Sequence, residues 1–322
     1  MKQIQISQLG GPEVMKLVEA PKPSPGPGQA LVKITASGVN FIDVYFRTGV
    51  YKVDFPFTTG SEASGLVEAV GPDVTEFKPG HRVVYAMARG SYSEYAIVPA
   101  AMLVAIPESV DFESAAAAML QGMTAHYLTH STYRLKPGDK ALVHAAAGGT
   151  GALIVQMAKM LGATVYGTAG SEEKAVIAKQ AGADETIIYT QEDFAAEVKR
   201  FTSGKGVDVI YDSVGATTFA KGLDLLRPRG TMALFGQSSG VVQPIDPNIL
   251  NPKGSLFLTR PSLTHYVLTR EELLWRAGDV LNWIGSGKLK LRIDKKYSLA
   301  DAAQAHRDLE GRKTAGKLLL IP

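Results

Sequence analysis

The segment from His144 to Gly151 (HAAAGGTG) is flanked by apolar stretches that give its glycines a structural meaning. Residues 140–144 are typical of a short buried strand, residues 152–161 of an apolar helix, and residues 164–168 of a second strand. A strand, a tight glycine turn and a helix start direct bare backbone N–H groups, at the positive end of the helix dipole, toward one point. Such a point binds a pyrophosphate, so the sequence predicts a dinucleotide site.

The glycine spacing follows the pattern G-x-G-x-x-G with one exception. Ala146 stands in the first place, while Gly148 and Gly151 hold the second and third. Gly148 would let the backbone approach phosphate, and Gly151 would let the helix pack closely on the strand. An alanine fits the first place if the turn keeps a negative φ there. The alternative is an ordinary loop rich in small residues, but the flanking elements favour the nucleotide site.

The composition narrows the class of protein. A chain of 322 residues exceeds a usual single domain, so we expect two. The net charge of +3 is small and no basic stripe is present, which argues against a nucleic-acid partner. The absence of cysteine excludes disulfides, thiolate zinc sites and cysteine nucleophiles. The chain starts with a polar-alternating strand and has no apolar run long enough to span a bilayer, so we expect a cytoplasmic enzyme.

The chain changes character near Asp111. Before it, short alternating strands are predicted at residues 31–36, 64–70, 81–85 and 93–98. After an alanine-rich helix at 112–128, strands and helices alternate to about residue 260, which predicts a parallel sheet covered on both faces. The further strands are expected at 185–189, 207–212 and 231–235, and the helices at 172–180, 192–202 and 217–226. Two more helices, at 271–285 and 299–310, and a strand at 317–321 close the chain. The segments flanking the nucleotide domain should form the other domain, with a substrate cleft between the two.

The second strand of the nucleotide domain indicates which dinucleotide binds. Enzymes that prefer NAD usually end this strand with Asp or Glu, which binds the ribose 2′-hydroxyl. Here it ends GTAGS (167–171), without a carboxylate that would repel a 2′-phosphate. Lys174 could direct its ammonium there, with Ser171 capping the helix and Tyr189 alongside. Lys174 could instead be an ordinary solvated lysine, but the missing acid favours NADPH.

Seven short motifs are spread along the chain: NFID (40–43), GSEASG (60–65), KPGHRV (78–83), AAAGGTG (145–151), YDSVG (211–215), FGQSSG (235–240) and TRPS (259–262). This set resembles the zinc-free quinone oxidoreductases, a family that includes zeta-crystallin and belongs to the medium-chain dehydrogenase/reductase superfamily. The resemblance implies an α/β fold with two domains. A β-rich chaperonin-10-like (GroES-like) catalytic domain would comprise residues 1–125 and 262–322, and a Rossmann doubly wound parallel sheet residues 126–261. It also implies a homodimer formed through the Rossmann sheets and reduction of quinones with NADPH.

The resemblance further implies a set of site residues. Asn40 and Tyr45 would lie beside the nicotinamide and the substrate, with Tyr51 at the rim. Gly148 and Gly149 would hold the pyrophosphate, and Lys174 and Tyr189 the 2′-phosphate. The full set of implied cofactor residues is Asn40, Tyr45, Tyr127, Ala147, Gly148, Gly149, Thr150, Gly170, Ser171, Lys174, Tyr189, Val214, Phe235, Gly236, Ser238, Ser239, Leu258, Arg260 and Arg312.

The resemblance also implies that no metal is bound. In the zinc-dependent relatives a cysteine ligand stands at the position of Asn40, and Gly-His-Glu stands where this chain has Gly60-Ser61-Glu62. Alcohol oxidation without a Lewis acid is difficult, whereas a quinone accepts a hydride or single electrons from nicotinamide unaided. We hypothesise that the Asn40 amide hydrogen-bonds the quinone oxygen or the nicotinamide ribose, and that Tyr45 stacks on the acceptor or donates to it. The alternative makes Tyr45 a core aromatic and Asn40 a turn residue.

Other candidate sites are weaker. His126 and His130 share a helical face but lack the glutamate and third ligand of a metal site. Trp275 and Trp283, with neighbouring Leu273 and Leu274, are interpreted as the packing face of an amphipathic helix. Two alternative functions stay open: an NADPH-dependent reductase of activated C=C bonds such as enones or enoyl thioesters, and a non-catalytic NADPH-binding protein with an RNA-binding or structural role.

Overall fold

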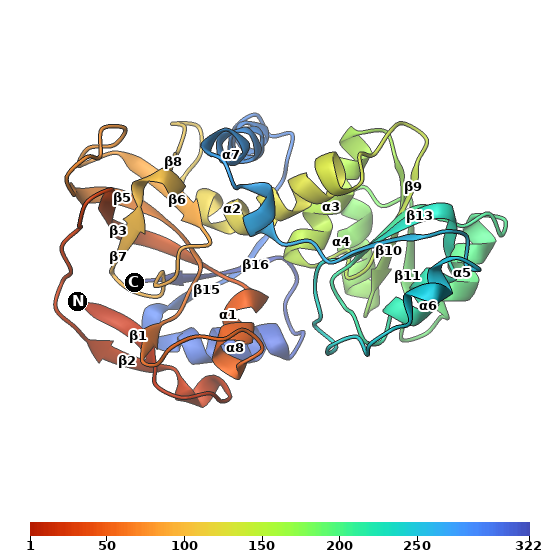
Figure 1. Ribbon diagram of the computed structural model, residues 1–322, viewed down its shortest axis with the longest axis horizontal. Helices are drawn as coiled ribbons and strands as arrows, with labels where there is room; N and C mark the ends of the chain where they lie inside the picture. The colour runs from red at the N-terminus through yellow and green to blue at the C-terminus, as the bar shows by residue number, and fades with distance from the viewer. The chain divides into compact units, whose positions relative to one another are not determined.

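The computed structural model describes all 322 residues, and the chain divides into two compact units (Figure 1). Unit 1 comprises Met1–Met123 and Val267–Pro322, and unit 2 comprises Thr124–Tyr266. The first boundary falls within one helix, α2 (Phe112–Tyr127). No helix of the chain is long and apolar enough to cross a membrane.

Unit 2 is built on six parallel strands in the order β11-β10-β9-β12-β13-β14. The strands are β9 (Lys140–Val143), β10 (Thr164–Ala169), β11 (Glu185–Ile188), β12 (Val207–Asp212), β13 (Leu226–Leu234) and β14 (Phe257–Thr259). Counted along the chain, this order is 3-2-1-4-5-6, the strand order of the Rossmann fold. The predicted doubly wound parallel sheet is therefore confirmed. The order reverses between β9 and β12, and ligands of such sheets bind at the carboxyl ends of the strands at that point.

Continuous apolar runs make these strands central and parallel. Ala141, Leu142 and Val143 of β9 are all fully buried, as expected for a strand covered on both faces. Four helices connect the strands: α3 (Gly149–Met160), α4 (Glu172–Gln180), α5 (Phe194–Phe201) and α6 (Phe219–Leu223). Phe194 and Val198 of α5 share one hydrophobic core with strand residues. This core fixes the strand ends from which the candidate site is built.

The helix predicted at residues 217–226 is wrong at its C-terminal end. Helix α6 stops at Leu223, and Leu226 is the first residue of β13 rather than the last of a helix. Leu226 pairs with Val207 before a shift of register along β12, and its side chain is buried. Burial in the sheet therefore outweighs the helical pattern of the preceding residues.

Unit 1 contains two sheets. Seven strands follow the order β15-β16-β3-β5-β6-β8 with β7 on β3, and three follow the order β2-β1-β4. The strands are β1 (Lys2–Ile6), β2 (Lys16–Glu19), β3 (Gln29–Val39), β4 (Phe57–Thr58), β5 (Glu62–Val70), β6 (Arg82–Ala86), β7 (Tyr95–Pro99), β8 (Val104–Ala105), β15 (Ile293–Ser298) and β16 (Lys317–Ile321). The C-terminal strand β16 pairs antiparallel with β3, Leu319 opposite Gly38. The end of the chain thus completes the sheet begun by its first third.

The other helices of unit 1 are α1 (Phe41–Thr48), α7 (Arg270–Gly285) and α8 (Ala302–Glu310). The predicted packing face of α7 is partly wrong, because Leu274 and Trp275 are 41% and 44% exposed. The buried face instead carries Leu273, Arg276, Ala277, Val280 and Leu281. These buried residues are three or four positions apart, so they lie on one side of the helix. Leu274 and Trp275 lie outside this face.

Candidate functional site

The turn after β9 has the geometry of a phosphate-binding turn. Gly148 is the N-cap of α3 and has no side chain to cap the first N–H groups of that helix. The left-handed backbone falls at Ala145 (φ 52°), one residue before Ala146, so an alanine fits the first motif place. A Cβ added to Gly151 would lie 2.2 Å from the Ala145 carbonyl oxygen, which explains the third glycine. Ala147, Gly149 and Thr150 complete the turn and the first helical positions.

The tip of β10 lies beside this turn. The Ala146 N–H donates to the Thr168 carbonyl at 2.9 Å, and Ser171 caps α4 by accepting the Lys174 N–H at 3.3 Å. A Cβ on Gly170 would come within 2.6 Å of the Tyr189 hydroxyl. Gly170, Ser171, Tyr189 and the backbone of Lys174 therefore lie together at this tip, and no acidic residue stands between β10 and the helix cap.

The loops after β12 and β13 interlock. The Ser213 carbonyl accepts the Ser238 N–H at 3.1 Å, and the Val214 carbonyl accepts the Ser239 N–H at 2.9 Å. A Cβ on Gly236 would lie 2.5 Å from the Ser213 oxygen. Val214, Phe235, Gly236, Ser238 and Ser239 thus form one continuous surface at the carboxyl ends of two neighbouring strands.

Asp212 organises these loops, and the sequence analysis did not single it out. Its Oδ1 accepts the N–H groups of Val214 at 2.7 Å and Gly215 at 3.0 Å, and its Oδ2 accepts the Thr218 hydroxyl at 2.8 Å. The signal that could have revealed this role is an aspartate at the end of a buried strand, where its side chain accepts from the next turn.

The remaining predicted cofactor residues are more scattered. Arg260 donates to the Leu234 carbonyl at 3.0 Å, just beyond Leu258 on the edge strand β14. Tyr127 is 2% exposed, and its ring stacks on that of Tyr266 with centroids 4.2 Å apart. Arg312 follows α8 and belongs to unit 1, as do Asn40, Tyr45 and Tyr51.

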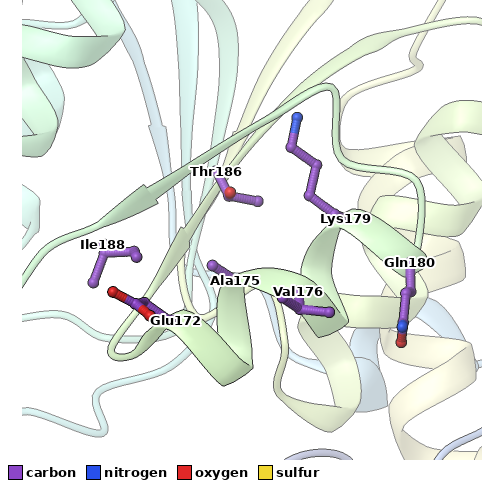
Figure 2. Close-up of a pocket in the computed structure, with 7 residues that line it drawn as sticks. All are labelled: Glu172, Ala175, Val176, Lys179, Gln180, Thr186 and Ile188. Carbon is purple, nitrogen blue, oxygen red and sulfur yellow. The ribbon is translucent and has the colours of Figure 1, made fainter.

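A depression of about 510 Å³ lies over α4 and β11 (Figure 2). It is lined by Glu172, Ala175, Val176, Lys179, Gln180, Thr186 and Ile188. None of the predicted site residues lines it. It contains no part of the glycine turn after β9, so it is not the pyrophosphate site.

In unit 1, helix α1 carries a cluster of aromatic rings. The rings of Tyr45 and Tyr51 meet edge to face with centroids 5.5 Å apart, and Phe46 and Tyr51 do so at 5.6 Å. The Tyr51 N–H donates to the Tyr45 carbonyl at 3.1 Å. Tyr45 is half-buried and Tyr51 is 38% exposed. The cluster therefore presents ring surface that a flat molecule could cover.

Asn40, immediately before α1, is held by buried neighbours. Its Nδ2 donates to Glu62 Oε2 at 2.8 Å and to the Gly38 carbonyl at 3.2 Å. Its Oδ1 accepts the Lys317 ammonium at 2.7 Å. A carboxamide has two N–H donors, so both are used inside the protein. For the Asn40 amide to donate to a quinone oxygen or to the nicotinamide ribose, one of these internal hydrogen bonds would have to break.

The donor atoms around Asn40 do not fit a metal ion. Ser61, at the position of the histidine in the zinc-dependent relatives, donates to Asp43 Oδ1 at 2.7 Å. Lys317 Nζ lies 2.5 Å from Glu62 Oε2, so an ammonium already neutralises that carboxylate. No group of three or more His, Cys, Asp or Glu side chains in the chain is placed to hold a metal, and His126 and His130 stack on each other at 4.3 Å.

A second buried polar network lies beyond Ser61. Burial raises the pKa of Asp43 to about 6, although the Ser61 hydroxyl and the Asn40 N–H oppose the shift. Tyr92 hydrogen-bonds Asp43 Oδ2 at 3.2 Å and His306 Nε2 at 3.1 Å. Burial, aided by nearby Arg47, lowers the pKa of His306 to about 3. This imidazole is therefore neutral at physiological pH. It contacts α1 indirectly, through Tyr92 and Asp43.

Comparisons with known proteins agree with this architecture. The alcohol dehydrogenase GroES-like domain model matches residues 26–108, and the zinc-binding dehydrogenase model matches residues 149–276. The two matches place the chain in the medium-chain dehydrogenase/reductase superfamily and confirm the GroES-like domain.

Individual relatives indicate which family within this superfamily the chain resembles. A quinone oxidoreductase of Pseudomonas aeruginosa is 45% identical over 100% of this chain and 99% of its own length. A 2-haloacrylate reductase of a Burkholderia species is 44% identical over 98% of each. The crystal structure of Escherichia coli quinone oxidoreductase complexed with NADPH has a TM-score of 0.98 at 44% identity, with 100% of both chains covered. This chain belongs to the quinone oxidoreductase family, as its motifs predicted.

Proposed function

We propose that the protein reduces quinones with NADPH. The observation that carries this proposal is the tip of β10, which ends without a carboxylate, where Ser171 caps α4, Lys174 lies in the first turn of that helix and the Tyr189 hydroxyl lies against Gly170. A 2′-phosphate there would meet a cation and a helix N-terminus instead of a repelling acid. The names of the relatives, and the NADPH bound to the E. coli enzyme, support the same cofactor and acceptor.

Each part of the site has its task in this proposal. Gly148, Gly149 and Thr150 bind the pyrophosphate through backbone N–H groups, and the loops at Val214 and Phe235–Ser239 hold the nicotinamide half. Leu258, Arg260 and Tyr127 contribute further cofactor contacts within unit 2. Bound NADPH supplies the reducing equivalents, as a hydride or as single electrons.

The acceptor half of the reaction belongs to unit 1. Tyr45 and Tyr51 offer ring faces on which a flat quinone stacks, and the Tyr45 hydroxyl donates to the quinone oxygen that gains charge. Asn40 holds the start of the helix that carries Tyr45. The proposed reaction needs no metal, because a quinone accepts a hydride or single electrons from nicotinamide without prior activation.

The test is a substrate panel with purified protein, following the loss of NADPH absorbance. We expect turnover with benzoquinones and naphthoquinones, and a Tyr45→Phe variant with lower kcat but nearly unchanged NADPH affinity. The absence of quinone turnover at any concentration, or a variant with unchanged kcat, would contradict the proposal for the acceptor or for Tyr45 respectively.

A second candidate activity is reduction of activated C=C bonds. The 2-haloacrylate reductase relative favours it, since that protein covers the whole chain at nearly the same identity. Enones and haloacrylates accept a hydride in the same plane-to-plane geometry. Strong turnover of these compounds with negligible quinone turnover would make this the main activity.

We also propose that two copies pair through their Rossmann sheets. Strand β14 is an edge of the sheet, and its Phe257 is 60% exposed. An uncovered edge strand with an exposed aromatic residue is a site for pairing with another chain. Light scattering should give twice the mass of one chain for the wild type and a monomer for Phe257→Lys.

A further inference from the structure

A lysine, a glutamate and an asparagine form a buried cluster in unit 1. The side chains of Lys317 and Glu62 are 3% and 0% exposed, and their charged atoms are 2.5 Å apart. Lys317 comes from the C-terminal strand β16, Glu62 from β5, and Asn40 from the end of β3. Burying two charges is costly unless both are paired and hydrogen-bonded, so this arrangement requires a reason beyond stability.

Every strong hydrogen-bonding atom of the cluster has a partner. Glu62 Oε1 accepts the N–H of Leu120 in α2, while Oε2 accepts from both Asn40 and Lys317. The Asn40 oxygen accepts from Lys317 at 2.7 Å. Because the anion accepts from the amide nitrogen and the cation donates to the amide oxygen, only one of the two flipped orientations of the carboxamide is satisfied.

The side chain of Asn40 anchors the residue that begins α1. The backbone N–H of Asn40 donates to Asp43 Oδ2 at 3.0 Å, so the position of residue 40 sets the first turn of α1. Tyr45 lies one turn further along α1, and its carbonyl accepts the Tyr51 N–H. The buried cluster therefore acts on the start of the helix that carries Tyr45, through the position of residue 40.

We propose that Lys317 and Glu62 are positioning residues for the acceptor site: together they hold the Asn40 side chain, and thereby the start of the helix that carries Tyr45. The proposal rests on the proposed quinone chemistry for its kinetic consequence. Its structural consequence, the fixed Asn40 carboxamide, is independent of that chemistry.

Two variants test the proposal together. Lys317→Met leaves the Glu62 carboxylate buried without a counter-charge and should lower the thermal unfolding midpoint by roughly 6–20 °C. The double variant Lys317→Met/Glu62→Gln removes both charges and should recover most of that loss. The matched control is Lys295→Met, on the neighbouring strand β15, where the lysine side chain is 56% exposed. This variant should change neither the unfolding midpoint nor kcat.

Kinetics then separate positioning from stability. In the double variant the Asn40 oxygen has lost the Lys317 ammonium and keeps only the long hydrogen bond from Gln121 Nε2 at 3.5 Å, so kcat for quinone should stay roughly 10–100-fold below wild type, with the NADPH Kd within about twofold. Recovery of kcat together with the unfolding midpoint would show a purely structural role and overturn the proposal.

A crystal structure of the double variant gives a readout that needs no turnover. We expect the Asn40 carboxamide to rotate or α1 to shift, and an unchanged Asn40 and α1 would overturn the proposal. A wild-type protein without quinone turnover would contradict the proposed function instead, and this outcome is distinguished because the crystal structure and the unfolding midpoints do not depend on it.

Discussion

Replacing Gly151 by alanine tests whether the turn after β9 is the pyrophosphate site. The added Cβ would lie 2.2 Å from the Ala145 carbonyl oxygen and 3.0 Å from its carbon. Contacts shorter than about 3.2 Å between such atoms are strongly repulsive, so the start of α3 must move by about 1 Å away from the turn. Both atoms belong to backbone, so no flexible side chain can absorb the clash.

A shift of this size should weaken NADPH more than it weakens the fold. Loss of one hydrogen bond from backbone N–H to a charged phosphate costs about 1.5–3 kcal/mol, which raises the Kd roughly 10–150-fold. Overpacking costs about 1–3 kcal/mol of stability, so the variant should remain folded. Calorimetric titration with NADPH, with circular dichroism as the check of folding, measures both. A folded Gly151→Ala variant that binds NADPH as tightly as the wild type would refute the assignment of this turn.

Three further predictions concern other residues. Gly278→Ala, in the interior of α7 where an added Cβ meets nothing within 4 Å, should stabilise the protein by about 0.5–1 kcal/mol in urea unfolding, and a loss of stability would show that this surface is not open. Lys174→Glu should raise the Kd for NADPH roughly 10–100-fold and that for NADH far less in calorimetry; equal effects on both would show that Lys174 does not read the 2′-phosphate. The lowered pKa of His306, about 3 against an ordinary 6.5, means that the unfolded chain binds more protons between these values, so wild-type stability is complete above pH 6.5 and falls as the pH decreases. His306→Gln keeps a partner for Tyr92 but has no imidazole to protonate, so at about pH 4.5 its free energy of unfolding should fall by roughly 3 kcal/mol less than that of the wild type. Urea midpoints of the two proteins that fall in parallel across this range would contradict a neutral buried imidazole.

The nucleotide-binding unit could be predicted in detail because local patterns determine it. The β9 turn, the Ser171 cap of α4 and the acid-free tip of β10 all depend on residues within a few positions of each other. The end of α6 could not be predicted this way, since the burial of Leu226 in the sheet, a tertiary effect, converts a helical pattern into strand. The burial of Trp275 was predicted from a run of large apolar residues, but its position around the helix places it outside the buried face of α7.

The acceptor side of the site was only half predictable. Tyr45 and Tyr51 follow from the resemblance, but the partners of Asn40 come from 22 and 277 positions away along the chain. Lys317 opens an apolar strand and gives no local sign that its ammonium is buried. An interpretation of Asn40 as a donor to the substrate was natural from its residue type. Only the three-dimensional arrangement shows that Glu62, Gly38 and Lys317 already use its hydrogen bonds.

The central claim is that NADPH reduces a quinone here without a metal, and metal content measured against turnover tests it most directly. Purified protein should be divided, treated with chelator or with added zinc, and assayed for zinc by mass spectrometry and for NADPH oxidation with a quinone. The account predicts that turnover is the same in both portions and unrelated to zinc content. Turnover that disappears with the chelator and returns in proportion to bound zinc would contradict it.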